Sequence, residues 1–223
     1  TISGGTLNVN GSVSMTTGVF NFSAGAFNID GNSNVSGTSV PVGTNIFTVA
    51  SAVTGTVNGG ITTIVDPHFG AATVPTFTFT GSVASRTWAG NTLRLGNGTS
   101  TDASSAANGF ELDTYVNSNR LTLGTLEVNG NGGTTSRIVT TASATADGTF
   151  ITNLLINANS ELRNTTATNF HVEGNITNNG TLSVLNTLKL IKADGSSAVT
   201  IGQTVSGSGV FRNLTSSPTA NFN

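Results

Sequence analysis

A five-residue pattern of hydrophobic and polar positions recurs along the chain: apolar, any residue, apolar, polar, glycine. The stretches that match it are Leu7–Gly11 (LNVNG), Phe27–Gly31 (FNIDG), Phe77–Gly81 (FTFTG), Leu126–Gly130 (LEVNG) and Phe170–Gly174 (FHVEG). Their starts are separated by 20, 50, 49 and 44 residues. A structural repeat of about 20–25 residues that carries insertions would produce these separations.

The pattern predicts a short β-strand that ends in a turn. Side chains alternate across a strand, so the first and third positions point to the interior and the second faces water. Glycine ends the strand because it accepts the positive φ that a turn requires. Apolar residues at helical spacing are not sustained over any window of about 11 residues. We therefore expect an all-β protein. The recurring module favours a parallel β-solenoid with irregular loop insertions, and a pair of β-sandwiches is the alternative.

Irregular spacing and proline divide the chain. Residues 1–38 and 91–214 carry the regular pattern and are predicted to form solenoid coils. Residues 39–90 hold three of the four prolines and are predicted to be an irregular or loop-rich section of the solenoid. Residues 215–223 are predicted to be a linker or the start of a further unit. Because the chain begins inside a strand pattern, we expect it to be an internal piece of a longer polypeptide.

The composition narrows the possible functions. Charged residues make up 8% of the chain, against about 25% in typical soluble domains, so neutral polar side chains must cover the surface. The absence of cysteine excludes disulfides, thiolate metal sites and cysteine nucleophiles. Lysine and arginine are few and scattered, which argues against a nucleic-acid partner. No stretch approaches the roughly 20 apolar residues that span a bilayer, so we expect no membrane insertion in this segment.

Arg86 and Trp88 are the first candidate site. They lie two positions apart on a predicted strand, so their side chains should be neighbours on one face. An exposed tryptophan beside an arginine would form a platform for carbohydrate binding or a cation–π pair. The alternative is that this single tryptophan lies in the core.

Glu111 and Asp113 are the second candidate site. In the stretch 110–116 (FELDTYV) they alternate with apolar residues, so both carboxylates should point outward, about 7 Å apart. Such a pair could bind Ca²⁺ or act as acid and base on a glycan. The alternative is an ordinary solvated strand face. The calcium-binding nonapeptide and the nucleotide-binding glycine motifs are absent, so no cofactor is expected.

Two segments carry a resemblance to known proteins: residues 4–11 (GGTLNVNG) and 175–182 (NITNNGTL). They are similar to the degenerate repeats of very large bacterial surface proteins. Among these are the β-helical adhesins of autotransporter and two-partner secretion systems, and giant surface proteins of gliding bacteria related to the flavobacteria. The resemblance implies a right-handed parallel β-helix that serves as a stalk and carries adhesive parts away from the cell. It assigns no functional residue to this chain.

We therefore expect a non-enzymatic structural segment of a large cell-surface or extracellular adhesin or filament, which presents an elongated rod for attachment. The expected partners are copies of itself or further repeats of the same chain, together with surface glycans or abiotic surfaces. The expected location is secreted, at the cell surface or extracellular. Two alternatives stay open. One is a polysaccharide-acting β-helix enzyme, a lyase or glycoside hydrolase. The other is a carbohydrate-binding module or a phage tail-spike segment.

Overall fold

The computed structural model describes residues 1–30, 47–65, 77–79, 86–97, 110–113, 115–116, 119–120, 122–129, 137–141, 149–164, 170–184, 188–189 and 205–213. These residues form strands, bends and turns, and they include no helix. The described part of the chain is therefore all-β, as the alternating pattern predicts. It contains no helix that is long and apolar enough to cross a membrane.

Two large sheets hold nearly all of the described strands. The first, ten-stranded sheet contains β1 (Ile2–Asn10), β3 (Phe22–Asp30), β5 (Ile61–Ile64), β8 (Thr92–Leu95), β12 (Thr122–Val128), β14 (Thr149–Ile156), β16 (Phe170–Val172) and β19 (Leu188–Lys189), with β17 (Ile176–Asn178) beside β14 and β20 (Val205–Ser206) beside β17. The second, nine-stranded sheet contains β2 (Val13–Val19), β4 (Phe47–Thr56), β6 (Phe77–Phe79), β9 (Phe110–Asp113), β13 (Arg137–Thr141), β15 (Ser160–Asn164), β18 (Thr181–Val184) and β21 (Val210–Asn213), with β7 (Arg86–Thr87) beside β4. A separate antiparallel pair consists of β10 (Tyr115–Val116) and β11 (Asn119–Arg120).

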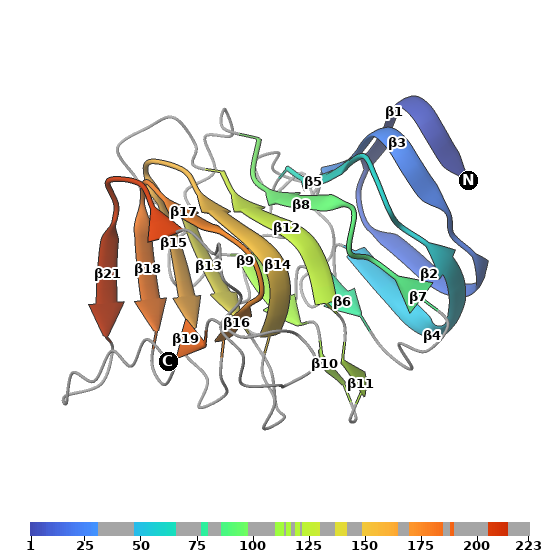
Figure 1. The fold of residues 1–223 in the computed structure, drawn as a ribbon. Coiled ribbons are helices and arrows are strands. Elements are labelled where there is room, and N and C mark those ends of the chain that lie inside the picture. Colours follow the sequence, from blue (N-terminus) through green and yellow to red (C-terminus); the bar gives the residue numbers. More distant parts are fainter. Residues whose placement is uncertain are drawn as a thin grey trace.

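The chain passes back and forth between the two sheets. Strand β1 lies in the first sheet, β2 in the second and β3 again in the first, and the chain continues in this way to β21 at the other end of the molecule (Figure 1). The exceptions among the described strands are β7, which follows β6 in the second sheet, β17 and β20, which follow β16 and β19 in the first, and the separate pair β10 and β11. The described pairings within the two sheets are parallel. Parallel pairing differs from the antiparallel sheets of a β-sandwich, which was the alternative. We call a stretch that contributes strands to both sheets a layer; the first layer is β1 and β2.

In-register pairing aligns similar residues from layer to layer. One inward column of the first sheet contains Val9, Ile29, Ile64, Leu95, Val128 and Ile156. Apart from half-buried Val9, these residues are buried. Partners in the column are separated by between 20 residues (Val9 to Ile29) and 35 residues (Ile29 to Ile64). Most layers are therefore longer than the predicted 20–25 residues, because connections can lengthen while the strand register is kept.

The five copies of the sequence pattern do not occupy one position in the fold. Leu7, Phe27 and Leu126 share an inward column of the first sheet. Phe77 lies in the second sheet, and Phe170 lies in β16 at a different register from that column. The pattern thus marks a strand that ends at a glycine in either sheet, and it does not mark a fixed point of each layer.

Aromatic side chains join the two sheets in the N-terminal layers. Phe47 of the second sheet packs against Phe27 of the first, with ring centroids 5.7 Å apart in an edge-on arrangement. It also contacts Phe77 at 5.4 Å and Trp88 at 6.2 Å. Edge-on and tilted ring pairs stabilise a core beyond the area that they bury. These rings belong to one hydrophobic cluster that draws buried residues from both sheets.

The section predicted to be loop-rich, residues 39–90, contributes strands to both sheets where it is described. Strands β4, β5, β6 and β7 come from it, and the first three pair in parallel with strands of the neighbouring layers. The prediction for residues 215–223 lies outside the described residues. The boundaries of the regular stretches, 1–38 and 91–214, stay predictions.

The layers approach each other so closely at one bend that no side chain fits there. A Cβ atom placed on Gly59 would lie 2.0 Å from the carbonyl oxygen of Ser23 in the preceding layer. On the other side, the side-chain amide of Asn91 in the following layer donates to the carbonyl oxygens of Gly59 and Gly60, at 2.9 and 3.0 Å. Gly59 is therefore enclosed by backbone and amide groups, and only glycine leaves enough room.

We expect Gly59→Ala to lower the free energy of unfolding by about 3 kcal/mol, in the upper part of the range for overpacking, because backbone atoms of Ser23 would have to move. Gly4→Ala is the matched control, since a Cβ atom on Gly4 would meet nothing within 4 Å. Its free energy of unfolding should stay within about 0.5 kcal/mol of the parent value or rise slightly. Urea unfolding followed by circular dichroism measures both variants, and an equal loss in the two would contradict the close approach.

Candidate functional site

The outward face of the first sheet carries a column of polar side chains. It consists of Asn8, Asn28, Thr63, Arg94 and Glu127, one from each of five successive layers. Adjacent members are one strand spacing apart, about 4.8 Å. The amide of Asn28 donates to the side-chain oxygen of Asn8 at 2.8 Å, which is the contact that repeats in an amide ladder. Strand pairing therefore sets the spacing of this polar row.

A groove of about 520 Å³ lies over the N-terminal part of this column. It is lined by Asn8, Val9, Asn10, Asn28, Asp30, Thr63, Val65, Arg94 and Asn97. Amides and hydroxyls both donate and accept hydrogen bonds, and the groove adds one carboxylate and one guanidinium. A ligand that is rich in hydroxyl groups matches this mixture, because each hydroxyl can also donate and accept.

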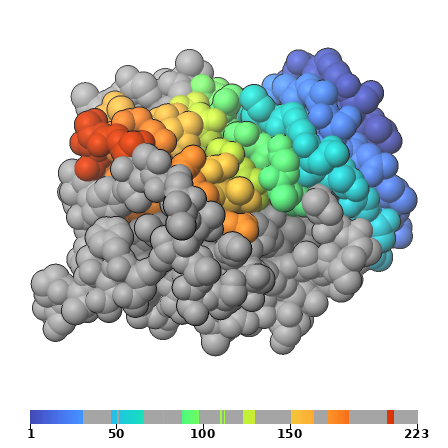
Figure 2. Space-filling model, viewed as in Figure 1, coloured from blue at the N-terminus to red at the C-terminus, as the bar shows by residue number. Residues whose placement is uncertain are grey.

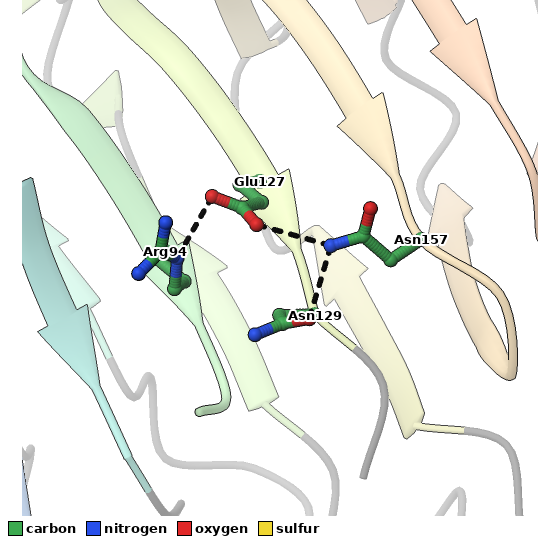
Figure 3. A network of polar contacts seen from close by, with 4 residues as sticks. All are labelled: Arg94, Glu127, Asn129 and Asn157. Carbon is green, nitrogen blue, oxygen red and sulfur yellow. Dashed lines mark hydrogen bonds and ion pairs between the residues drawn. The ribbon is translucent and has the colours of Figure 1, made fainter. Parts of the chain in front are cut away.

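A polar network fixes the guanidinium at one end of the groove (Figure 3). The Nε atom of Arg94 donates to Oε2 of Glu127 at 2.8 Å. The amide of Asn157 donates to the other carboxylate oxygen at 3.0 Å and to the side-chain oxygen of Asn129 at 3.0 Å. Three successive layers, those of β8, β12 and β14, are connected in this way.

The burial of Glu127 makes these partners necessary. The residue is 8% exposed although it lies on the outward side of its strand. A carboxylate with so little access to water is costly unless charged or polar groups bond to it. Arg94 and Asn157 supply those bonds, so Glu127 holds Arg94 in place, and Arg94 in turn borders the groove.

A second ionic cluster lies in the second sheet. Arg163 donates to both carboxylate oxygens of Glu161, from Nε at 3.0 Å and from Nη2 at 2.8 Å. The hydroxyl of Ser183 in the next layer donates to Oε1 of Glu161 at 2.6 Å. Glu161 is 6% exposed and Ser183 is fully buried. The bidentate ion pair lies within β15 and holds the Glu161 carboxylate in place. The hydroxyl of Ser183 connects this carboxylate to the next layer, and this geometry fits an anchor between strands.

The structure places Trp88 in the core and corrects the prediction of an exposed platform at Arg86 and Trp88. The indole of Trp88 is 3% exposed, and its ring centroid lies 6.0 Å from that of Phe20 and 5.9 Å from that of Phe77. A stacking platform needs an open ring face, which Trp88 does not have. Arg86 lies in β7, and its side chain is outside the described part of the structure.

Glu111 and Asp113 lie in β9, as the alternating pattern predicts. Phe110 and Leu112 are fully buried, which places them on the inward face. The side chains of Glu111 and Asp113 are outside the described residues, so a Ca²⁺ site at this pair stays a prediction. Among the side chains that the structure describes, no group of three or more His, Cys, Asp or Glu residues could hold a metal ion.

The sequence reasoning missed the groove, although a signal for it was present. In the stretches Leu7–Gly11 and Phe27–Gly31 the second and fourth positions are Asn, Asn, Asn and Asp. These positions alternate with the inward residues, and the two strands pair exactly 20 residues apart. Polar residues at the outward positions of two paired strands would have indicated a polar surface patch, had the pairing been known.

Comparison with known proteins found no matching family model, no matching curated protein and no matching solved structure.

We expect Arg94→Ala to lower the free energy of unfolding by about 1–3 kcal/mol, because it leaves the buried carboxylate of Glu127 with one polar partner fewer. In a Glu127→Gln background, the same substitution should lower the free energy of unfolding by a smaller amount, since no buried carboxylate charge remains to be compensated. A double-mutant cycle from urea unfolding measures the difference, expected at roughly 0.5–3 kcal/mol. The network would be refuted if Arg94→Ala had the same effect in both backgrounds.

Proposed function

We propose that this chain is a non-enzymatic segment of a large cell-surface or extracellular adhesin or filament, in which the two parallel sheets close into a right-handed β-helix. The observation that carries the proposal is the repeated passage of the chain between two parallel sheets, so that the main strands of each sheet follow one another in sequence order. A chain that leaves β1, passes through β2 and returns beside β1 as β3 makes a parallel crossover. Such crossovers are right-handed in about 98% of cases.

The stacked layers suit a rod. Along the main path of each sheet, the described strands pair with strands of the neighbouring layers, so added layers lengthen the structure without a new fold. Each one extends the axis by about 4.8 Å. A long rod presents many weak contacts at once, and their combined avidity can exceed any single affinity by orders of magnitude. Attachment by avidity needs a contact surface that repeats along the rod, and it requires no catalytic residue.

The groove on the first sheet is the contact surface that we propose for attachment. Its row of amides, Asn8, Asn10 and Asn28, offers donors and acceptors along the stacking direction. Its guanidinium is already bonded to Glu127, and only Asp30 adds a further charge to the lining. These features favour a neutral, hydroxyl-rich partner such as a surface glycan over nucleic acid or an anionic membrane.

Cryo-electron microscopy of the native full-length material should show a thin rod with a repeat of about 4.8 Å along its axis. Antibodies raised against this chain should label intact, unpermeabilised cells of the organism that produces it. A compact particle would contradict the rod, and labelling that appears only after permeabilisation would contradict the proposed location.

Asn28→Ala should weaken binding to neutral polysaccharides about two- to tenfold, because one net hydrogen bond to a ligand is worth about 0.5–1.5 kcal/mol. The measurement is retardation in affinity electrophoresis through gels that contain dextran, starch or xylan, with an acidic polysaccharide for comparison. The control is Asn179→Ala, an exposed asparagine outside the groove. Attachment through the groove is ruled out if no polysaccharide retards the parent chain, or if both variants behave alike.

A further inference from the structure

The groove on the first sheet is longer along the stack of layers than along the strands. Its lining comes from the layers of β1, β3, β5 and β8, which follow one another in sequence order (Figure 1, Figure 2). Three strand spacings separate the first of these strands from the last, about 14 Å. Each layer contributes a short stretch, such as Asn8–Asn10 or Arg94–Asn97, which covers two or three residue steps, about 7 to 10 Å. The long axis of the groove therefore runs along the stack.

Hydrogen-bonding groups repeat along this axis. The outward residues Asn8, Asn28, Thr63 and Arg94 are register partners from β1 to β8, so they form one row that is spaced by the strands. The amide of Asn28 donates to the side-chain oxygen of Asn8. Within the described part of the chain, the amide group of Asn8 and the side-chain oxygen of Asn28 make no further hydrogen bond. A donor and an acceptor are therefore available to a ligand at the first two positions of the row.

Arg94 supplies donors at the other end of the row. Its Nε atom bonds to Glu127, whereas Nη1 and Nη2 make no hydrogen bond to any residue that the structure describes. The side chain is 31% exposed and lines the groove. Glu127 compensates the charge of the guanidinium and holds it in place, so Arg94 presents two fixed donors that suit the oxygen atoms of a neutral ligand.

The apolar part of the groove is small. Val9 and Val65 are its hydrophobic members, and the described lining contains no aromatic ring. A ligand must therefore be bound mainly through its own polar groups, without ring stacking. Because one net hydrogen bond contributes little, a ligand has to engage several positions of the row at once. These constraints favour a polymer over a single small molecule.

We propose that the groove binds an extended neutral glycan, with the β-linkage of cellulose, xylan or mannan, whose chain lies along the stack. Each ring of such a chain advances it by about one strand spacing, about 5 Å, so that one sugar unit faces each layer. An α-linked glucan coils or bends and leaves a straight row after a short stretch. The inference rests on the proposed function, because it names the glycan class and its direction for the same groove.

Titration of the isotope-labelled chain with cello-oligosaccharides of increasing length, followed by NMR, tests the proposal. We expect the affinity to rise about two- to tenfold with each added sugar unit, since each unit adds about one net hydrogen bond. The rise should level off at about three or four units, because the lining spans three strand spacings. Malto-oligosaccharides of the same lengths, which are α-linked, should bind more weakly and show no such rise.

Asn8→Ala and Arg94→Ala test the direction of the glycan, because the two residues lie at opposite ends of the row. Each substitution should weaken binding of the longest cello-oligosaccharide about two- to tenfold. Asn179→Ala, at an exposed residue outside the groove, should bind like the parent. Circular dichroism checks that the variants keep their strands. If Arg94→Ala loses them, the length series and Asn8→Ala decide the outcome.

Equal binding of the two oligosaccharide series, or an affinity that does not rise beyond the disaccharide, would overturn the inference and leave attachment through the groove intact. A loss of affinity in only one of two folded end variants would also overturn it, because the ligand would then lie across the row. If neither series binds, the inference fails together with glycan attachment through the groove. Microscopy and antibody labelling decide the rod and its location separately.

Discussion

Backbone hydrogen bonds between neighbouring layers hold this structure together. The amide of Thr92 donates to the carbonyl of Gly60 at 3.1 Å, and the amide of Thr125 donates to the carbonyl of Asn91 at 3.0 Å. Buried amides and carbonyls must find partners, and in parallel sheets the partners come from the adjacent strand. A slip of one residue would exchange the inward and outward faces and would bring Asn28 into the core. The register of the paired strands is therefore the constraint that stays constant from layer to layer. Connections can differ in length and outward residues can differ in chemistry as long as this register is kept. Glycine is required where the register brings the backbones of two layers into contact.

The strands and their inward faces could be predicted from the sequence, because alternation is a local property. The stretches around Leu7, Phe27 and Leu126 are strands with their apolar residues in one column, as expected. The length of each layer could not be predicted, since insertions between strands leave no periodic signal. Trp88 was misplaced because a side chain at a strand end can lie on either side of the sheet. The groove was missed because it depends on which strands pair, and pairing is not local.

Two buried carboxylates connect neighbouring layers. Glu127 bonds to Arg94 of the preceding layer and to Asn157 of the following one, and Glu161 bonds to Ser183 of the next layer. A protein with 8% charged residues thus uses Arg94, Glu127 and Glu161 to connect neighbouring strands, where partial burial strengthens the hydrogen bonds. The remaining outward surface presents mainly amides and hydroxyls, which suits repeated weak contacts better than strong ionic ones.

The aromatic cluster couples the first layers to one another. Rings of Phe20, Phe27, Phe47, Phe77 and Trp88 interlock across these layers. In a stack of layers, local opening separates first at the weakest interface. Because each of these rings contacts rings from other layers, the first layers share one core, and under tension they should yield together as one unit and not strand by strand.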